Sequence, residues 1–181
     1  MRVMDQGSPV VAVDETGFFS TEAPSHGYGK LGHRLKPVKI QKHRIRLSCA
    51  MAIDTMGRVY HRFENGAFNG RRFQSFIQQL EQYPKGSVIV MDNIGFHKSK
   101  SVQHLVNRRG LKIMFTPPYS PECNPSERFF SIIKLHFRNS LLHPFGSSVE
   151  DFRGMVHLAI KRARDTCSIP SLFSLSEVSS S

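Results

Sequence analysis

Acidic side chains that follow apolar runs are the residues of this sequence best suited to chemistry. Residues 87–91 form a largely apolar, β-branched run that is typical of a strand buried on both faces, and Asp92 and Asn93 follow it directly. In open α/β sheets, ligands bind beyond the carboxyl ends of the strands. Asp92 is therefore a candidate for chemistry, although an Asp at such a place can instead cap the following loop through hydrogen bonds to the backbone.

Glu127 is the second candidate acid, and the residues around it predict the start of a helix. Asn124 fits an N-cap, Pro125 a first helical residue and Glu127 the third, which together form a capping-box pattern. At 100° per residue, Glu127 shares one side of this helix with Ser131, Lys134 and Arg138. The apolar side lies broadly opposite, with Phe129, Ile132, Ile133 and Phe137. Glu127 is thus predicted to face away from the core, either as a helix cap or as a carboxylate that serves a metal-bound, phosphate-bearing substrate.

Several segments of this region resemble the catalytic core of mariner-superfamily transposases. His97 follows Asp92 by five residues, and a Pro-Pro-Tyr-Ser-Pro segment at 117–121 leads into Asn-Pro-Ser-Glu at 124–127. Those enzymes carry three acids, a DDE or DDD triad. One large branch of the family has 34 residues between the second and third acids, as here between Asp92 and Glu127. The resemblance covers residues 10–140.

The resemblance makes Asp14 the first acid, because residues 10–13 repeat the pattern of an apolar strand that ends in Asp. It implies that Asp14, Asp92 and Glu127 are catalytic and hold metal. Three clustered carboxylates repel one another unless a cation neutralises them, and oxygen ligands suit Mg²⁺ or Mn²⁺. Two ions about 4 Å apart can activate a water or a DNA 3′-hydroxyl and stabilise the leaving oxygen. The resemblance therefore implies two-metal DNA cutting followed by strand transfer in transposition.

Other polar residues near the three acids are assigned lesser roles. Glu15 and Glu122 do not occupy acidic positions of the family, so we leave them out of the predicted site. Asn93 and His97 match the family segment that follows the second acid. We expect Asn93 to orient Asp92, and His97 to support the site or contact DNA. A single histidine near a helix start can also be purely structural, because one local partner satisfies it.

The strongly basic composition of the chain predicts a polyanionic partner. Lys and Arg number 25 against 14 Asp and Glu, and the net charge of +11 favours nucleic acid over a generally basic surface without function. Seven Lys and Arg and no acid lie between residues 30 and 46. This pattern fits either a loop that contacts phosphates or a solvated basic loop. The predicted DNA-contacting residues are Lys30, Arg34, Lys36, Lys39, Lys134 and Arg138.

Further features of the sequence argue against several other classes of protein. Cys49, Cys123 and Cys167 are odd in number and lack metal-type spacing, which disfavours both a disulfide framework and a zinc site. Residues 27–32 match Gly-x-Gly-x-x-Gly by letter, but they do not directly follow a strand and Pro37 opposes a helix after them, so a dinucleotide site is rejected. No membrane span or leader is recognisable. We expect an intracellular protein that works on DNA, in a nucleus or a bacterial nucleoid.

The order of predicted elements indicates a mixed α/β fold. Strand patterns occupy residues 9–14, 45–53, 58–64, 87–91 and 111–115. Helical periodicity occupies 73–80, ended by Pro84 and Gly86, then 102–110, and a third helix from 125. This order predicts a mixed five-stranded sheet with helices on its faces. It is also the order of the ribonuclease-H-like fold on which the resembled transposases are built.

We expect one ribonuclease-H-like catalytic domain over residues 1–167. Periodic apolar residues from 152 to 163 add a C-terminal helix with a cap at Ser147 or Ser148. The Ser-rich residues 168–181 are predicted to be a disordered tail.

The resemblance also bears on partners and on alternative functions. Mariner-like transposases carry helix-turn-helix modules ahead of the catalytic domain, and only 13 residues precede Asp14 here. End recognition is therefore expected from a separate domain or chain, and the dimers that family members form on paired ends predict a homodimer. A catalytically silent DNA-binding or assembly module would keep the fold and basic face without needing the acids or an ion. A structure-selective nuclease would share the site and differ only in its products.

Overall fold

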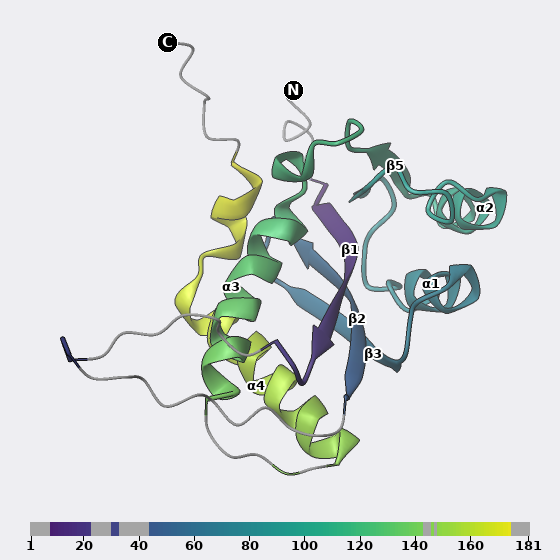
Figure 1. The fold of residues 1–181 in the computed structure, drawn as a ribbon. Coiled ribbons are helices and arrows are strands. Elements are labelled where there is room, and N and C mark those ends of the chain that lie inside the picture. Colours follow the sequence, from purple (N-terminus) through teal and green to yellow (C-terminus); the bar gives the residue numbers. More distant parts are fainter. Residues whose placement is uncertain (1–7, 23–29, 33–43, 143–145, 147, 175–181) are drawn as a thin grey trace.

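One mixed sheet forms the centre of the described part of the molecule. The computed structural model describes residues 8–22, 30–32, 44–142, 146 and 148–174. The strands are β1 (Val10–Phe19), β2 (Arg46–Asp54), β3 (Val59–Asn65), β4 (Val88–Met91) and β5 (Lys112–Phe115). They lie in the order β3-β2-β1-β4-β5, with β1 antiparallel to β2 and parallel to β4 (Figure 1). The predicted mixed five-stranded sheet is therefore confirmed.

The pairing of β1 with β4 sets the position of the first acid. All four residues of β4 are apolar and buried, as expected for a strand with helices on both faces. The parallel pairing ends where Ala12 lies beside Val90. β1 itself continues to Phe19 because its second half pairs with β2, so the predicted strand end at residue 14 is wrong. Asp14 nevertheless lies two residues beyond the last β1–β4 pair, beside the point where β4 ends.

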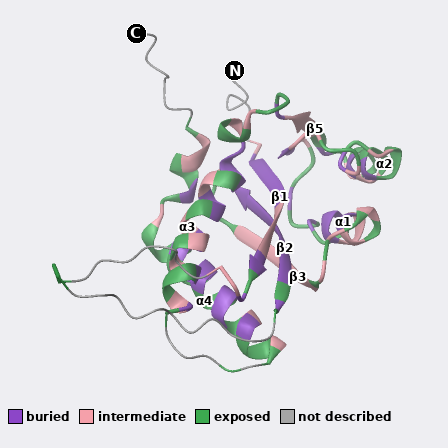
Figure 2. Cartoon of the chain, viewed as in Figure 1, coloured by how far each residue is buried: buried purple, intermediate pink, exposed green. Residues whose placement is uncertain are grey.

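Two pairs of helices cover the two faces of the sheet. The helices are α1 (Gly70–Gln78), α2 (Lys100–Arg108), α3 (Pro125–Ser140) and α4 (Val149–Thr166). α1 and α2 close one cluster of buried apolar side chains, and α3 and α4 close the other. Figure 2 shows buried residues in the central strands and along parts of the helices. The predicted helices are confirmed, although α1 ends well before Pro84. None of the described helices is long and apolar enough to cross a bilayer.

Side chains along β1 point alternately to the two faces, as they must in an extended strand. Ala12 and Phe18 pack with α3 and α4, whereas Val13 packs with α1 and α2. The same alternation directs Asp14 to the α3 side of the sheet and Glu15 to the α1 side. The adjacent acids Asp14 and Glu15 therefore lie on opposite faces of the sheet and contact different elements.

Aromatic side chains hold α3 and α4 to the sheet. Phe137 of α3 lies edge-to-face against Phe18 of β1 and Phe152 of α4, with ring centroids 5.1 and 5.6 Å apart. Ser148 caps α4 and forms a capping box with Asp151. The predicted C-terminal helix is confirmed, with its periodic apolar residues buried.

The chain after α4 differs from the predicted disordered tail. A short 3₁₀ helix, η3 (Ile169–Phe173), packs against the cluster beneath α3 and α4. Ile169 is buried there, and Leu172 and Phe173 are partly buried. These apolar contacts offset the entropy cost of ordering the segment, which a Ser-rich composition does not reveal. Residues 175–181 and the alternative cap Ser147 lie outside the described residues.

Candidate active site

Three acidic side chains from separate elements line one cleft. Asp14 lies on β1, Asp92 directly follows β4, and Glu127 lies in the first turn of α3. The cleft has a volume of about 420 Å³, and residues 116–121, between β5 and α3, form much of its wall. The structure thus brings together the three acids selected from the sequence, and their catalytic roles stay a prediction.

The start of α3 is tied directly to β1 through its cap. Asn124 is the N-cap, as predicted, and its side-chain oxygen accepts a hydrogen bond from the Ser126 amide at 3.1 Å. The Asn124 side-chain NH₂ group donates to Oδ2 of Asp14 at 2.8 Å. The Asn124 backbone amide donates to the Pro121 carbonyl, so the capping box offered as an alternative role for Glu127 does not form. Glu127 instead lies exposed at the cleft.

Asp14 is buried, with only 6% of its surface exposed, although it lines the cleft. Burial raises the pKa of its carboxyl group to about 8, because water no longer stabilises the charge. The backbone amide of Glu15 donates a hydrogen bond to Oδ1 of Asp14 at 2.7 Å, and this bond lowers the pKa because it stabilises the charged form. The nearby carboxylates of Glu15, Glu127 and Asp92 raise the pKa further. Added positive charge would therefore favour the ionised form, and the site is suited to a cation.

His97 connects the residue after β4 with the middle of β1. Its ring is fully buried, with Nδ1 2.5 Å from Oδ1 of Asp92 and Nε2 3.1 Å from Oε1 of Glu15. Burial alone lowers the pKa of the ring, but the hydrogen bonds to the two carboxylates outweigh it and raise the pKa to about 9. A protonated ring donates from both nitrogens. The contacts favour the supporting role predicted for His97, and its burial argues against the predicted contact with DNA.

Two residues that the sequence does not identify as part of the site contact its members. Glu15 does not occupy an acidic position of the family, yet it accepts a hydrogen bond from His97. Strand alternation was the available signal, since a neighbour of Asp14 on β1 must point to the opposite face. The sequence predicts only a capping role for Asn124, because its second hydrogen bond, to Asp14, depends on tertiary packing that the sequence does not show.

Two loops form the walls of the cleft. Asn93 lines it, but within the described residues no hydrogen bond joins its side chain to Asp92, and His97 takes the orienting role predicted for Asn93.

Tyr119 has a positive φ of 56° and a fully exposed side chain. A non-glycine residue in this backbone region costs energy, and such residues cluster at functional sites. Because Tyr119 lines the cleft and its side chain is fully exposed, it also places an aromatic ring at the wall of the cleft.

The predicted DNA-contacting residues are only partly visible in the structure. Three lie outside the described residues: Arg34, Lys36 and Lys39. Lys30 is exposed. Lys134 and Arg138 lie on α3 close to Glu22, whose pKa is raised by burial while the two cations act to lower it. Part of their charge therefore balances Glu22, and their contact with DNA stays a prediction.

The donor set at the cleft fits a hard divalent cation. Within the described ranges, no group of three His, Cys, Asp or Glu side chains lies close enough to hold an ion together. Mg²⁺ does not require such a group, because it keeps several waters and is bound by one or two carboxylates plus substrate phosphates. Asp14, Asp92 and Glu127 supply oxygen atoms alone, which suit Mg²⁺ and Mn²⁺ better than softer metals.

Comparison with known proteins places these residues in a family. Residues 9–150 match the family described as DDE superfamily endonuclease. A comparison with curated protein sequences gives no match. The solved Mos1 strand transfer complex has a TM-score of 0.62 at 16% identity, covering 93% of this chain and 56% of the Mos1 chain. The catalytic domain of Mos1 mariner transposase has a TM-score of 0.57 at 16% identity, covering 91% of this chain and 73% of the Mos1 domain chain.

These likenesses settle the fold and the family. The mixed sheet with the order 3-2-1-4-5 and its flanking helices is ribonuclease-H-like and matches the Mos1 catalytic domain, as predicted. The chain spans about half the length of the first Mos1 chains that it matches. The family match covers most of the chain and includes all three acids of the cleft. The chain therefore belongs to the DDE superfamily endonucleases, with a fold that matches the catalytic domain of Mos1 mariner transposase.

Proposed function

We propose that this chain is the catalytic domain of a DDE transposase that cuts DNA at transposon ends and transfers the freed strand. The convergence of Asp14, Asp92 and Glu127 on one cleft, from two neighbouring strands and a helix start, carries the proposal. The endonuclease description of the family supports cleavage of a phosphodiester. The likeness to a Mos1 strand transfer complex supports the second step.

In this proposal the three carboxylates hold Mg²⁺ or Mn²⁺, as a pair of ions. Such ions activate a nucleophilic oxygen and stabilise the leaving oxygen of an in-line displacement. Similar Mos1 paired-end complexes were solved with Mn and with Mg, which supports the choice of ion. The chain itself prepares the ligands, because Asn124 and the Glu15 amide fix Asp14 while His97 fixes one oxygen of Asp92.

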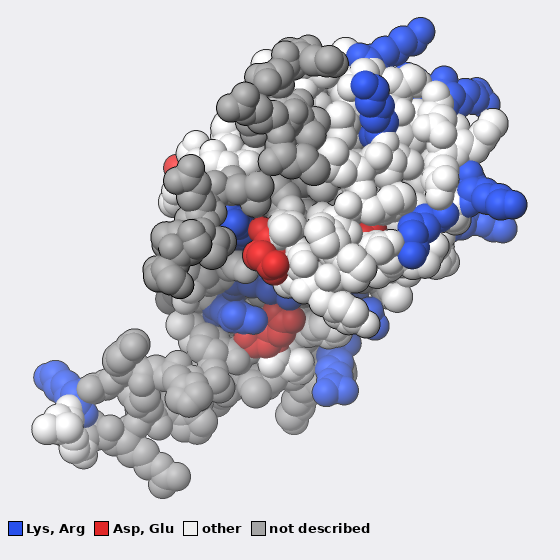
Figure 3. Space-filling model, turned by 90° about the horizontal axis from the view of Figure 1, so that it is seen from above, with Lys and Arg blue, Asp and Glu red and all other residues white. Residues whose placement is uncertain are grey.

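The charge of the chain supports DNA as the substrate. Figure 3 shows Lys and Arg side chains at many points around one face, where acidic side chains are few. With a net charge of +11, such a surface attracts the phosphate backbone. One similar Mos1 structure is a paired-end complex with the left transposon end. From it we infer that two copies of this chain act on paired ends. We further infer that a separate domain or chain recognises those ends, and that the protein works where cellular DNA is located.

Nicking of supercoiled plasmid tests the proposed cleavage. We expect open-circular product with Mn²⁺ or Mg²⁺ and none with EDTA, because the clustered carboxylates need a cation to act. A folded protein that binds DNA but nicks with neither ion would overturn the proposal and favour a catalytically silent binding module. Joining of a pre-cut 3′-end to the plasmid would support strand transfer, whereas nicking without joining would indicate a nuclease.

Metal binding is expected to release a proton near neutral pH. With a pKa of about 8, Asp14 is mostly protonated at pH 7, and a cation must displace that proton. Calorimetric titration with Mn²⁺ at pH 7, in two buffers with different ionisation enthalpies, should show about one proton released. Release should fall at pH 9, and affinity should rise from pH 6 to pH 8. Equal heats in both buffers at pH 7 would contradict this assignment.

A further inference from the structure

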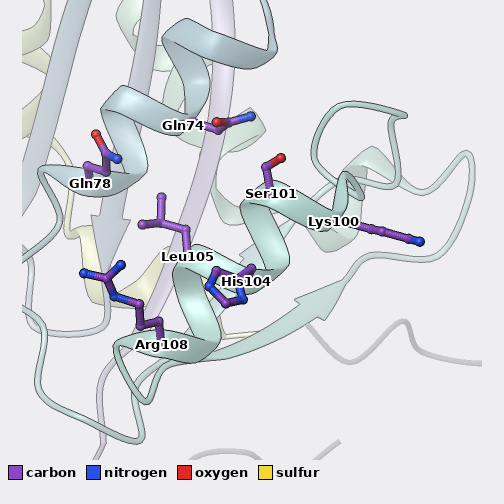
Figure 4. Close-up of a pocket in the computed structure, with 7 residues that line it drawn as sticks. All are labelled: Gln74, Gln78, Lys100, Ser101, His104, Leu105 and Arg108. Atoms are coloured by element: carbon purple, nitrogen blue, oxygen red, sulfur yellow. The ribbon is translucent and has the colours of Figure 1, made fainter.

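A polar groove separates α1 from α2 and takes no part in the cleft. It has a volume of about 490 Å³ and is shown in Figure 4. The side chains that line it are those of Gln74, Gln78, Lys100, Ser101, His104, Leu105 and Arg108. Six of the seven are polar, and five of those six can donate hydrogen bonds through nitrogen while Ser101 donates through its hydroxyl. The groove is therefore suited to an acceptor-rich ligand.

The spacing of these residues aligns them along the two helices. Lys100, His104 and Arg108 follow one another at i, i+4 and i+8 and form one stripe on α2. Gln74 and Gln78 have the same i, i+4 spacing on α1. From Lys100 to Arg108 the stripe extends about 12 Å, which is about the width of the DNA major groove. The stripe therefore places two cations at its two ends, where they can contact separate phosphates.

The positive charge of the groove is not balanced by nearby acids. The sequence contains no Asp or Glu between Asp92 and Glu122. Glu81, the acid after α1, is paired with Arg109 at 2.7 Å. Among the described residues, the side chains of Lys100 and Arg108 have no ion pair or hydrogen bond with the protein. Both cations are exposed, so they can contact a ligand without first breaking a contact within the fold.

The position of α2 connects the groove with the cleft. Asp92 directly follows β4, and α2 begins eight residues later at Lys100, so the start of α2 lies at the same edge of the sheet as the three acids. Figure 1 places α1 and α2 together on one side of the sheet, and Figure 3 shows Lys and Arg side chains gathered at that side. A duplex that enters the cleft can thus continue along this side of the molecule.

We propose that the groove between α1 and α2 binds the phosphate backbone of duplex DNA, at a distance from the reacting phosphate. Lys100 and Arg108 provide the charge, while Ser101, Gln74 and Gln78 provide neutral donors. These contacts carry no base readout, so binding is independent of sequence. That this duplex is the continuation of the DNA being cut rests on the proposed function. Binding of duplex DNA by the groove does not rest on it.

The salt dependence of DNA binding tests the groove directly. The full chain is titrated into a labelled 30-base-pair duplex in EDTA, and affinity is measured over a range of salt concentrations. Each lost phosphate contact makes the slope of log K against log salt less negative by about 0.9. The double variant Lys100→Gln/Arg108→Gln is therefore expected to lower affinity and to reduce the slope by about 1.8.

A matched control separates the groove from basic surface in general. Lys161→Gln/Arg162→Gln removes the same two charges from the exposed side of α4, on the other face of the sheet. This variant should change the slope little. An unchanged slope in the groove variant, or an equal change in the control, would overturn the proposal, as would a clear preference of the groove for double-stranded RNA. Binding is measured without metal, so a failed nicking assay would not affect this result.

Discussion

Asp92→Asn and Glu127→Gln are each expected to lower the rate of metal-dependent plasmid nicking by at least about 10³-fold, because a bound cation supplies several kcal/mol of charge stabilisation. Each change removes one negative charge from the cleft and keeps the size of the side chain. Asn at position 92 can still accept the hydrogen bond from His97, and Glu127 is exposed, so the fold should persist. Thermal unfolding and far-UV circular dichroism check that it does.

Glu122→Gln is the control for these two variants. Glu122 is an exposed acid five residues before Glu127, and it does not line the cleft. Its replacement removes the same charge from the same region and should leave nicking within about twofold of the original rate, because exposed charges outside a site contribute little. Nicking that survives in Asp92→Asn, or that falls equally in Glu122→Gln, would show that the cleft is not where the reaction occurs.

His97→Ala is expected to cost about 2 kcal/mol of stability and to lower nicking about 10- to 100-fold. The buried ring is the hydrogen-bond partner of Asp92 and Glu15, and its loss leaves both carboxylates without it. The stability cost falls below that of a fully buried pair because the Asp92 side chain is 35% exposed. Nicking is measured well below the unfolding temperature, so that a purely structural role of His97 would leave the rate unchanged.

The pH dependence of this stabilisation has a defined sign. The pKa of His97 is raised from 6.5 to about 9 in the folded state, so the protonated ring stabilises the fold fully below pH 6.5. The difference in stability between the original chain and His97→Ala should therefore shrink as pH rises from 6.5 through 9, measured in EDTA. His136→Ala is the control, since it removes a histidine of α3 whose hydrogen bond is to Thr166 at the surface. A difference that grows with pH would contradict a protonated His97.

The local sequence predicts those parts of the site that depend on one element each. The apolar run before Asp92 predicts a buried strand followed by an acid, and the structure has both. The Asn-Pro-Ser-Glu segment predicts the start of α3, and Asn124 caps it. Each prediction requires only the strand or helix pattern and the residue at its end.

The parts that the sequence does not reveal depend on contacts between elements. β1 continues beyond Asp14 because β2 pairs with its second half, and no pattern within β1 itself specifies that partner. The contact between His97 and Glu15 joins residues 82 positions apart. The hydrogen bond from Asn124 to Asp14 spans 110 positions. Similarly, η3 is ordered by the core that it contacts and not by its own composition.

Cleavage of the polypeptide by bound iron tests the central claim most directly, namely that the cleft lined by Asp14, Asp92 and Glu127 binds divalent cations through these carboxylates. Fe²⁺ replaces Mg²⁺, and ascorbate with peroxide generates radicals that cut the backbone close to the ion. We predict cuts near residues 14, 92 and 127, which excess Mg²⁺ suppresses and which Asp92→Asn weakens at all three positions. Cuts at other segments, or a pattern that Asp92→Asn leaves unchanged, would contradict a metal site formed by these acids.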